Sequence, residues 1–360
     1  MNIIYLAFSS SIGLGGHIRS MRDISNSIKP FVSSTKIFII CSKPQANYVE
    51  GINYLFLKDG YQKNISILKK HISKKSILHF FDIESCSYFS LIKHNKTLIT
   101  RCGGVNPSFW PKSLLTTTFS KENSQYFKTI GLKNVFYIPN RVADFRFNQE
   151  LIDKIKNKYN ISNDDYITLR VCRIKEYYHK SLLQTLSLGD EISKKIKKQV
   201  TVILIGGIED DKIYKSIILK STNLNIRLIS LTESVYTSEA RQIISIADTI
   251  IGTGRSLMEA AKTNAELYVP NRNSDLPIRL SKENFNELLS LNFSGRYSLK
   301  FDENGSTIKN KFIWNKYFYI NNDIIREYLN IYKNLPKIKP NLIFRVYMFL
   351  KLKAFIMRNL

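Results

Sequence analysis

The sequence has no long hydrophobic run, and its four cysteines are isolated from one another. No apolar stretch in the 360 residues reaches the roughly 18 to 20 residues that a membrane-spanning helix requires. Cys41, Cys86, Cys102 and Cys172 form no Cys-x-x-Cys pair, so the spacings typical of metal sites and redox motifs are absent. A disulfide framework is not expected in so long a chain. The pattern excludes an integral helical membrane protein and a disulfide scaffold.

The sequence is also poor in acidic residues. Asp and Glu number 29 against 54 Lys and Arg, which gives a net charge of +25. Such an excess favours polyanionic partners, namely nucleic acid, anionic lipid or phosphorylated substrates. A compositional alternative stays open, because a chain rich in Lys, Asn and Ile is also what an AT-biased genome encodes. The hydrophobic content of 44% excludes disorder and is enough for two domains with their own cores.

Short apolar runs bounded by turn residues predict strands that alternate with helices. Runs rich in Ile, Phe and Val are typical of parallel sheets that are covered on both faces. The first series of expected strands is 2–8, 36–41, 76–81, 97–100 and 134–138. The second series is 166–173, 200–205, 226–230, 249–251 and 266–269, with a helix over 182–195. We therefore expect an α/β protein with two Rossmann-like domains, whose ligands bind in a cleft beyond the carboxyl ends of the strands.

The expected domains are 1–150, 151–335 and a basic amphipathic helix over 336–360. The apolar start of the chain lacks a basic segment, so we interpret it as a buried strand rather than a signal peptide and expect a cytoplasmic protein. Residues 296–340 carry no motif, and we expect a helix there that returns to the first domain. The last helix mixes apolar residues with Arg345, Lys351, Lys353 and Arg358, which is typical of a membrane interface. The alternative is a terminal helix docked on the protein itself.

Glycine-containing loops follow three of the expected strands. Such loops let a ligand approach the backbone, and the helix N-terminus that follows favours an anion. The candidate donor-binding residues in these loops and the helix after them are Gly15, Gly16, Gly206, Gly207, Gly254, Arg255, Ser256 and Glu259. Backbone N–H groups near Gly254 are expected to hold a pyrophosphate, and the Glu259 carboxylate to accept both hydroxyls of a ribose. The alternative for Glu259 is a solvated or capping helix residue.

Two basic residues flank the next candidate site. Arg173 ends a strand, and Lys180 begins the following helix. Two cations beside a helix N-terminus suit a diphosphate leaving group. Because basic residues are common in this chain, charge alone is weak evidence for a site. The position of these two residues at the end of a strand is what indicates a binding role.

The order of these motifs resembles the retaining GT-B glycosyltransferases of the large family four, over about residues 1–295. The matching segments are the Gly15-Gly16 loop, Leu78-His79-Phe80-Phe81-Asp82, Thr100-Arg101-Cys102-Gly103-Gly104, Phe119-Ser120-Lys121-Glu122, Tyr137-Ile138-Pro139-Asn140-Arg141-Val142, Arg173 with Lys180, and Glu259-Ala260. The sequence departs from the family at one position, because Ile251 stands where the family has the first glutamate of its E-x7-E motif. The contact that this glutamate makes with the donor sugar is therefore missing or replaced, which leaves the identity of the donor open. The gap between Arg173 and Lys180 is also slightly longer than the family's.

The resemblance implies a hexosyltransferase that acts with retention at the anomeric carbon. It implies that Arg173 and Lys180 bind the donor phosphates, that Glu259 binds the nucleotide ribose, and that a donor phosphate oxygen takes the acceptor proton. His79 and Asp82 are candidates for the sugar or acceptor side, and the alternative for His79 is a buried core histidine. The sequence has no Asp-x-Asp metal motif at the expected site, so we expect neither a metal nor another cofactor.

The expected partners are a nucleotide-sugar donor, a saccharide or lipid-linked saccharide acceptor, and an anionic membrane surface bound by the C-terminal helix. This predicts a peripheral enzyme at the inner face of the cell membrane, in polysaccharide, lipopolysaccharide or capsule biosynthesis. Another nucleotide-sugar enzyme on the same fold, an inverting transferase or an epimerase, is the alternative. Nucleic-acid binding is not expected, because the basic residues are dispersed and no RNP, KH or zinc-finger signature is present.

Overall fold

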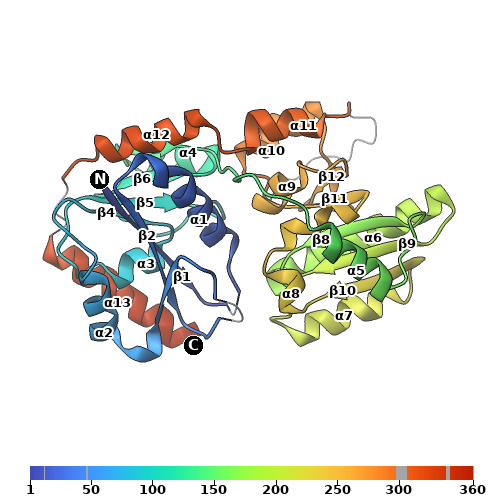
Figure 1. Cartoon of the computed structure of the whole chain (residues 1–360), viewed down its shortest axis with the longest axis horizontal. Helices are drawn as coiled ribbons and strands as arrows, with labels where there is room; N and C mark the ends of the chain where they lie inside the picture. Colours follow the sequence, from blue (N-terminus) through green and yellow to red (C-terminus); the bar gives the residue numbers. More distant parts are fainter. Residues whose placement is uncertain (12, 46–47, 297–305, 338–340, 360) are drawn as a thin grey trace. The chain divides into compact units, whose positions relative to one another are not determined.

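The protein is described by a computed structural model that covers residues 1–359 apart from 12, 46–47, 297–305 and 338–340, with side chains as far as residue 354. The chain divides into two compact units (Figure 1). The first unit is Met1–Ala143 with Ile320–Leu360, and the second is Asp144–Tyr319. The second unit therefore ends at Tyr319, whereas the sequence predicted a second domain over 151–335. The segment from residue 320 onward belongs with the first unit.

The first unit is built on a seven-stranded parallel sheet in the order β3-β2-β1-β4-β5-β6-β7. Its strands are β1 (Asn2–Ser9), β2 (Ser34–Cys41), β3 (Ile52–Phe56), β4 (Ile77–Phe80), β5 (Thr97–Arg101), β6 (Leu115–Thr118) and β7 (Val135–Tyr137). Its helices are α1 (Gly16–Ile28), α2 (Tyr61–Lys69), α3 (Ile83–Tyr88), α4 (Lys121–Thr129), α12 (Asn322–Lys333) and α13 (Leu342–Asn359). Buried clusters cover both faces of the sheet, one including α1 and α12 and the other α2, α3, α4 and α13.

The second unit has a six-stranded sheet in the order β10-β9-β8-β11-β12-β13, parallel except for β12 with β13. Its strands are β8 (Tyr166–Val171), β9 (Val200–Ile205), β10 (Ile226–Leu231), β11 (Thr249–Ile251), β12 (Glu266–Val269) and β13 (Ile278–Arg279). Its helices are α5 (Gln149–Lys158), α6 (His179–Ile196), α7 (Asp211–Ser221), α8 (Ser234–Thr237), α9 (Arg255–Ala260), α10 (Lys282–Ser290) and α11 (Asn310–Ile313). The two sheets confirm the predicted α/β class with two Rossmann-like domains.

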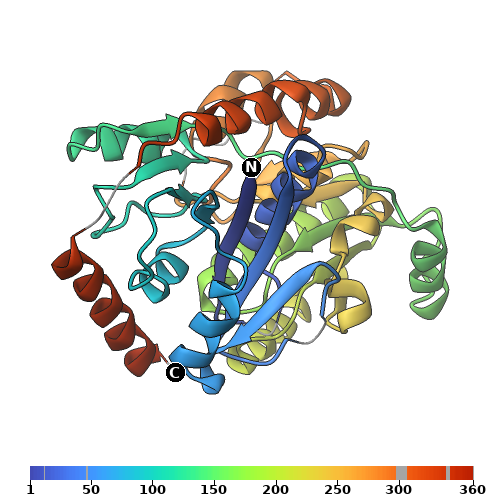
Figure 2. The same ribbon diagram turned by 60° about the vertical axis from the view of Figure 1, so that its left-hand side comes forward.

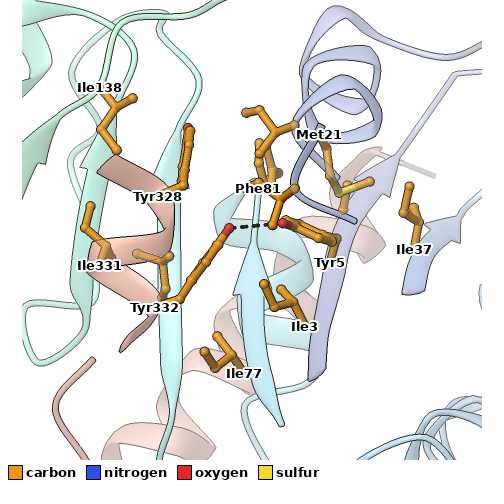
Figure 3. Close-up of a cluster of buried hydrophobic side chains, with 14 of the residues drawn as sticks. Ile3, Tyr5, Met21, Ile37, Ile77, Phe81, Ile138, Tyr328, Ile331 and Tyr332 are labelled. Atoms are coloured by element: carbon orange, nitrogen blue, oxygen red, sulfur yellow. Dashed lines mark hydrogen bonds between the residues drawn. The ribbon is translucent and has the colours of Figure 1, made fainter. Parts of the chain in front are cut away.

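Helix α12 returns to the first unit and completes its core. Ile324, Tyr328, Ile331 and Tyr332 are buried among residues of β1, α1 and β4, such as Ile3, Met21 and Ile77 (Figure 3). The spacing i, i+4, i+7 and i+8 places the four side chains of α12 on one face. The unit is therefore assembled from the two ends of the chain.

A chain of side-chain hydrogen bonds crosses this core. The Tyr332 hydroxyl lies 3.2 Å from the Tyr5 hydroxyl and 2.8 Å from His79 Nδ1. His79 Nε2 lies 2.6 Å from Thr100 Oγ1, which lies 2.6 Å from Thr117 Oγ1. Buried polar groups are costly unless they are paired, and here each has a partner. The chain of bonds ties α12 to four neighbouring strands, β1, β4, β5 and β6.

Helix α13 docks along the other face of the sheet (Figure 2, dark red). Met348 and Leu352 are buried, and Arg345 donates from Nε to the Ser90 carbonyl at 2.7 Å. The same helix leaves Leu342, Ile343, Val346, Tyr347 and Leu350 exposed. Among the described residues, no helix is both long enough and apolar enough to cross a membrane.

Two tyrosines of α12 offer a matched test of the core hydrogen bonds. We expect Tyr332→Phe to lower the free energy of unfolding by about 1–3 kcal/mol, because it removes a partner from Tyr5 and His79, both of which are buried. Tyr328→Phe should cause no loss, because the Tyr328 hydroxyl is buried without a hydrogen-bond partner among the described residues. Urea unfolding of both variants makes the comparison. Equal losses would mean that the hydrogen bonds contribute nothing beyond ring packing.

Candidate functional site

The carboxyl ends of β1 and β4 bring together the polar groups of the first unit. Gly15 is the N-cap of α1, and its carbonyl accepts hydrogen bonds from the Ile18 and Arg19 N–H groups at 3.1 Å. A Cβ on Gly15 would lie 3.0 Å from His17 Nδ1, whereas a Cβ on Gly16 would meet nothing within 4 Å. A side chain at Gly15 would therefore crowd the His17 ring unless the ring shifted. The sequence analysis did not single out His17.

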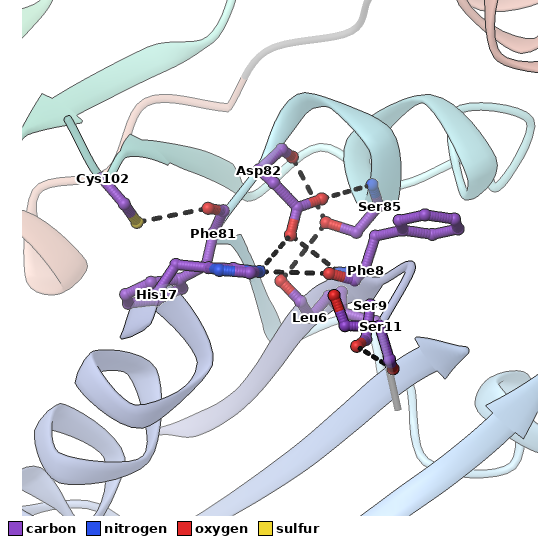
Figure 4. Close-up of polar contacts among 9 residues, drawn as sticks. All are labelled: Leu6, Phe8, Ser9, Ser11, His17, Phe81, Asp82, Ser85 and Cys102. Atoms are coloured by element: carbon purple, nitrogen blue, oxygen red, sulfur yellow. Dashed lines mark hydrogen bonds and ion pairs between the residues drawn. The ribbon is translucent and has the colours of Figure 1, made fainter. Parts of the chain in front are cut away.

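His17 lies beside Asp82 at this edge, where protonation of its ring would create an ion pair (Figure 4). His17 Nε2 lies 3.7 Å from Asp82 Oδ2 and 3.1 Å from the Phe8 carbonyl oxygen. A carbonyl oxygen only accepts, so the hydrogen bond to Phe8 requires the proton on Nε2, which leaves the lone pair of the neutral ring on Nδ1. The side chains of His17 and Asp82 are 31% and 13% exposed. The Phe8 carbonyl orients the ring, and Asp82 lies close enough to stabilise its protonated form, as a general base requires.

Asp82 also organises the backbone around it. Its Oδ1 accepts the Ser85 N–H at 2.6 Å as the N-cap of α3, and its Oδ2 accepts the Phe8 N–H at 2.7 Å. Burial raises the pKa of Asp82 to about 6, although these hydrogen bonds act in the opposite direction. Burial and the Asp82 charge also raise the pKa of Glu84. The raised pKa brings Asp82 closer to neutral pH than an ordinary carboxyl group, which favours a role in acid–base chemistry.

His79 does not lie at this edge. Its side chain is completely buried, between Tyr332 and Thr100, and burial lowers its pKa to about 3. A ring with no exposed surface touches no substrate, so the prediction of a catalytic role is wrong and the core alternative is right. Other motif residues are structural too. Ser120 caps α4, and Asn140 accepts a hydrogen bond from Ser20 at 2.9 Å.

In the second unit, β9, β8 and β11 are neighbours, so the loops that follow them share one edge of the sheet. These loops contain the predicted Gly206-Gly207, Arg173 and Gly254 segments. A Cβ on Gly206 would lie 1.8 Å from the Cys172 carbonyl oxygen, and one on Gly252 would lie 2.6 Å from the Leu257 Cα. Gly206 and Gly252 are therefore required, because any side chain at these positions would clash with the backbone of a neighbouring segment.

Arg173 belongs to a charged cluster with Glu209 and Lys175. The Arg173 guanidinium lies 3.1 Å from one Glu209 carboxylate oxygen, and Lys175 Nζ lies 3.2 Å from the other. The three side chains are between 23% and 34% exposed. Two cations share one carboxylate, so the cluster keeps a net positive charge at the edge of the sheet. Such a charge is suited to an anionic ligand.

Lys180 lies in the first turn of α6 and is exposed. Its Nζ donates to the Arg272 carbonyl oxygen at 2.6 Å. One turn later, the Gln184 amide donates to the carbonyl oxygens of Asn271 and Ser274. The start of α6 is thus fastened to the 271–274 segment.

The loop before α9 differs from the pyrophosphate site that the sequence predicted. The Thr253 N–H donates to Ser256 Oγ, the Gly254 N–H donates to the Phe293 carbonyl, and the Ser256 N–H donates to the Thr253 carbonyl. Gly254 has φ of +50°, which favours glycine. Because these three N–H groups are satisfied within the protein, they do not form an open cradle for phosphate.

Glu259 and Arg255 form a buried ion pair, with a distance of 2.8 Å between Arg255 Nε and Glu259 Oε1. Their side chains are 8% and 6% exposed, so the alternative of a solvated Glu259 is wrong. Binding of a ribose by Glu259 stays a prediction. Ile251 is completely buried in β11 and packs in a hydrophobic cluster with Leu188 and Tyr268.

Arg170 is a completely buried arginine beneath the same edge, which the sequence analysis missed. It donates to the Ile251 carbonyl at 3.1 Å and to Ser181 Oγ at 3.3 Å, whereas its Nε has no hydrogen-bond partner among the described residues. The sequence did carry a signal for Arg170, because a charged residue stands inside the otherwise largely apolar strand β8. In the described part of the chain, no three His, Cys, Asp or Glu side chains are grouped as a metal site.

The comparisons with known proteins identify the fold. No protein-family model and no curated protein matches the sequence. A glycosyltransferase structure from Rickettsia africae matches with a TM-score of 0.58 at 15% identity, over 93% of this chain and 98% of that one. WaaG, a glycosyltransferase involved in lipopolysaccharide biosynthesis, matches with a TM-score of 0.56 at 10% identity, over 93% and 100%.

A variant of Staphylococcus aureus TarM, solved with Fondaparinux, alpha-GlcNAc-glycerol and UDP, has a TM-score of 0.56 at 12% identity, over 92% of this chain and 100% of that one. The similarity in all three cases extends over both Rossmann-like domains. This chain therefore has the GT-B fold, which confirms the predicted architecture.

The opposite pKa shifts of Asp82 and His79 predict a measurable pH effect. Between about pH 4 and 6, folded Asp82 keeps a proton that the unfolded chain has lost, so Asp82 makes stability fall as the pH rises. Folded His79 stays neutral down to about pH 3, so His79 makes stability fall as the pH drops below about 6.5. The two effects oppose each other in the native protein.

Asp82→Asn removes one of these effects and keeps a good N-cap. We expect the free energy of unfolding of the variant to fall by about 1.4 kcal/mol more per pH unit than that of the native protein, as the pH drops from 6 to 4. Urea unfolding at pH 4, 5 and 6 measures both slopes. Parallel slopes would show that Asp82 titrates normally.

Proposed function

We propose that the protein is a glycosyltransferase that moves a sugar from a nucleotide-sugar donor to a saccharide acceptor in polysaccharide, lipopolysaccharide or capsule biosynthesis. The observation that carries the proposal is the net positive Arg173–Lys175–Glu209 cluster, which follows a central strand of a sheet with the GT-B fold. Ligands of open α/β sheets bind beyond the carboxyl ends of such strands. The glycosyltransferase structures that share the fold support the same reaction class.

Arg173 and Lys180 are the proposed ligands of the donor diphosphate, and Glu259 is the proposed ligand of the ribose. The partly exposed Arg173 guanidinium can turn from Glu209 toward a phosphate, because Lys175 still compensates that carboxylate. Cations fixed beside the leaving group stabilise the charge that develops as the glycosidic bond breaks. Transfer then proceeds with retention, and a donor phosphate oxygen takes the proton of the acceptor hydroxyl.

A lipid-linked acceptor and attachment to an anionic membrane surface complete the proposal. The exposed Leu342, Ile343 and Leu350 of α13 alternate with basic residues, as in helices that lie in a membrane interface. The docked face of α13 and this outer face are different faces of one helix. The enzyme would then be peripheral at the inner face of the cell membrane, without a metal.

An inverting transferase is the second candidate, and the His17–Asp82 pair favours it. Inversion by a single displacement needs a base for the acceptor hydroxyl. The Nδ1 edge of His17 faces the position where Gly15 has no side chain, and Asp82 stabilises the imidazolium that would form. Removal of this base should slow an inverting reaction by about 10²–10⁴-fold.

Nucleoside diphosphates test the donor site. We expect one of UDP, GDP or ADP to stabilise the protein against thermal unfolding, by about 2.7 kcal/mol at 100 times its dissociation constant. Arg173→Ala should lose most of this gain because it removes a phosphate ligand. Lys198→Ala, which removes an exposed lysine at the opposite end of β9, should keep it.

A short RNA serves as the control for charge alone. Stabilisation by RNA but by no nucleoside diphosphate would refute the proposal and favour a nucleic-acid-binding protein. Formation of product from the nucleotide sugar in the absence of any acceptor would favour an epimerase.

The stereochemistry of the product decides between the two transfer mechanisms. With the donor identified, we expect ¹H NMR to show the same anomeric configuration in donor and product. His17→Gln should then change kcat by less than about tenfold. An inverted product together with a loss of 100-fold or more in His17→Gln would favour the second candidate.

A further inference from the structure

A cavity of about 510 Å³ lies in the first unit, and neither His17 nor Asp82 is among its lining residues. Its wall includes Leu78 near the start of β4, Thr97 at the start of β5 and Leu114 just before β6. In a parallel sheet these positions mark the amino-terminal edge, opposite the loops that contain His17 and Asp82. The cavity is therefore separate from the candidate site of this unit.

The wall of the cavity is mainly apolar. Phe80, Phe89, Ile92, Leu114, Phe344 and Met348 contribute to it, the last two from α13. An apolar cavity of about 150 Å³ already binds benzene, so this one has room for a longer hydrocarbon segment. Helix α13 forms part of the wall, and it is held there by the Arg345 hydrogen bonds to the carbonyls of Ser90 and Leu91.

Four cations line the same cavity, namely Lys74, Lys93, Lys337 and Arg345. Lys74, Lys93 and Lys337 are exposed, so their charges lie toward solvent rather than inside the apolar wall. None of the described lining residues is acidic. An apolar interior with a cationic rim is complementary to an amphiphile with an apolar chain and an anionic head.

The outer face of α13 continues the apolar surface beside the cavity. Ile343 is 81% exposed and Leu342 is 66% exposed, next to the lining residues Phe344 and Arg345. Exposed apolar residues beside cations are typical of surfaces that contact the headgroup region of a bilayer. The same stretch of helix thus supplies both the wall of the cavity and the exposed apolar residues.

We propose that this cavity binds one acyl chain of an anionic membrane lipid, with the phosphate of that lipid held by the Lys74, Lys93 and Lys337 side chains and Arg345. The site goes beyond the proposed glycosyl transfer and does not depend on it. It deepens the proposed membrane attachment, because a chain withdrawn from the bilayer anchors α13 more specifically than surface contact alone.

Single-chain phosphates test the cavity without a membrane. Isothermal titration calorimetry with dodecyl phosphate, kept below its micellar concentration, should show saturable binding of one molecule to the full chain. Butyl phosphate should bind at least tenfold more weakly, because each buried methylene contributes about 0.8 kcal/mol. Equal binding of the two would overturn the proposal in favour of a simple phosphate site, and no binding of dodecyl phosphate would also overturn it.

Two variants and a control locate the binding. Ile92→Trp should fill the cavity and weaken dodecyl phosphate binding at least tenfold. Lys93→Glu should weaken it at least fivefold, since a basic residue near an anionic head contributes about 1 kcal/mol. Lys198→Glu, the same charge change at an exposed position of the second unit, should have less than a twofold effect. Equal effects of the two charge reversals would overturn the proposal, even if Ile92→Trp did not fold.

Vesicles identify the natural source of the ligand. Phosphatidylglycerol vesicles with a photoactivatable acyl chain should label peptides that contain 78–97 and 342–348, whereas labelling confined to the outer face of α13 would overturn the proposal. Nucleoside diphosphate binding by the same variants is measured in parallel. A protein that binds the lipid chain but no nucleoside diphosphate would refute the proposed transferase and leave the lipid site intact.

Discussion

The hydrogen bond between Tyr332 and His79 is the interaction on which the first unit depends. It joins a helix near the end of the chain to a strand of the central sheet, inside a core from which water is excluded. Because the Tyr5 and Thr100 side chains extend the network on both sides, any shift of α12 along the sheet would leave several buried polar groups unpaired. Apolar contacts alone tolerate such shifts. The network therefore specifies where α12 docks and makes the unit discontinuous in sequence.

The same network explains why His79 was misjudged from sequence. A histidine that follows apolar residues near the end of a strand has the pattern of a site residue, and its burial depends on Tyr332, which is 253 positions away. Long-range partners of this kind are not visible in a local pattern. The strands rich in Ile and Val were predicted closely, and β9 (Val200–Ile205) was predicted to the residue.

Strands β3, β6 and β13 were not predicted. In β6 the apolar signal is almost absent from the sequence, yet Thr116, Thr117 and Thr118 are all completely buried. Their hydroxyls bond to Trp110, Thr100 and the Ser120 carbonyl, so a polar sequence becomes a core strand through its partners. The return of α12 carried a usable signal, since its apolar residues follow the helical period. The sequence analysis expected a helix between 296 and 340 but did not place it.

The ion pairs of the second unit determine which of the predicted donor ligands can meet a phosphate. Arg255 and Glu259 neutralise each other in a buried pair, and separating them would leave an unpaired buried charge, which is strongly destabilising. Arg173 shares Glu209 with Lys175, so these three partly exposed side chains together carry a net positive charge. The rule that ligands bind beyond the carboxyl ends of the strands predicts both the Arg173 cluster and the Gly254 loop as binding sites. The ion pairs that each one forms in the structure distinguish the two. A diphosphate complements a cluster with a net positive charge, and the proposed phosphate contact accordingly rests on Arg173 rather than on the Gly254 loop.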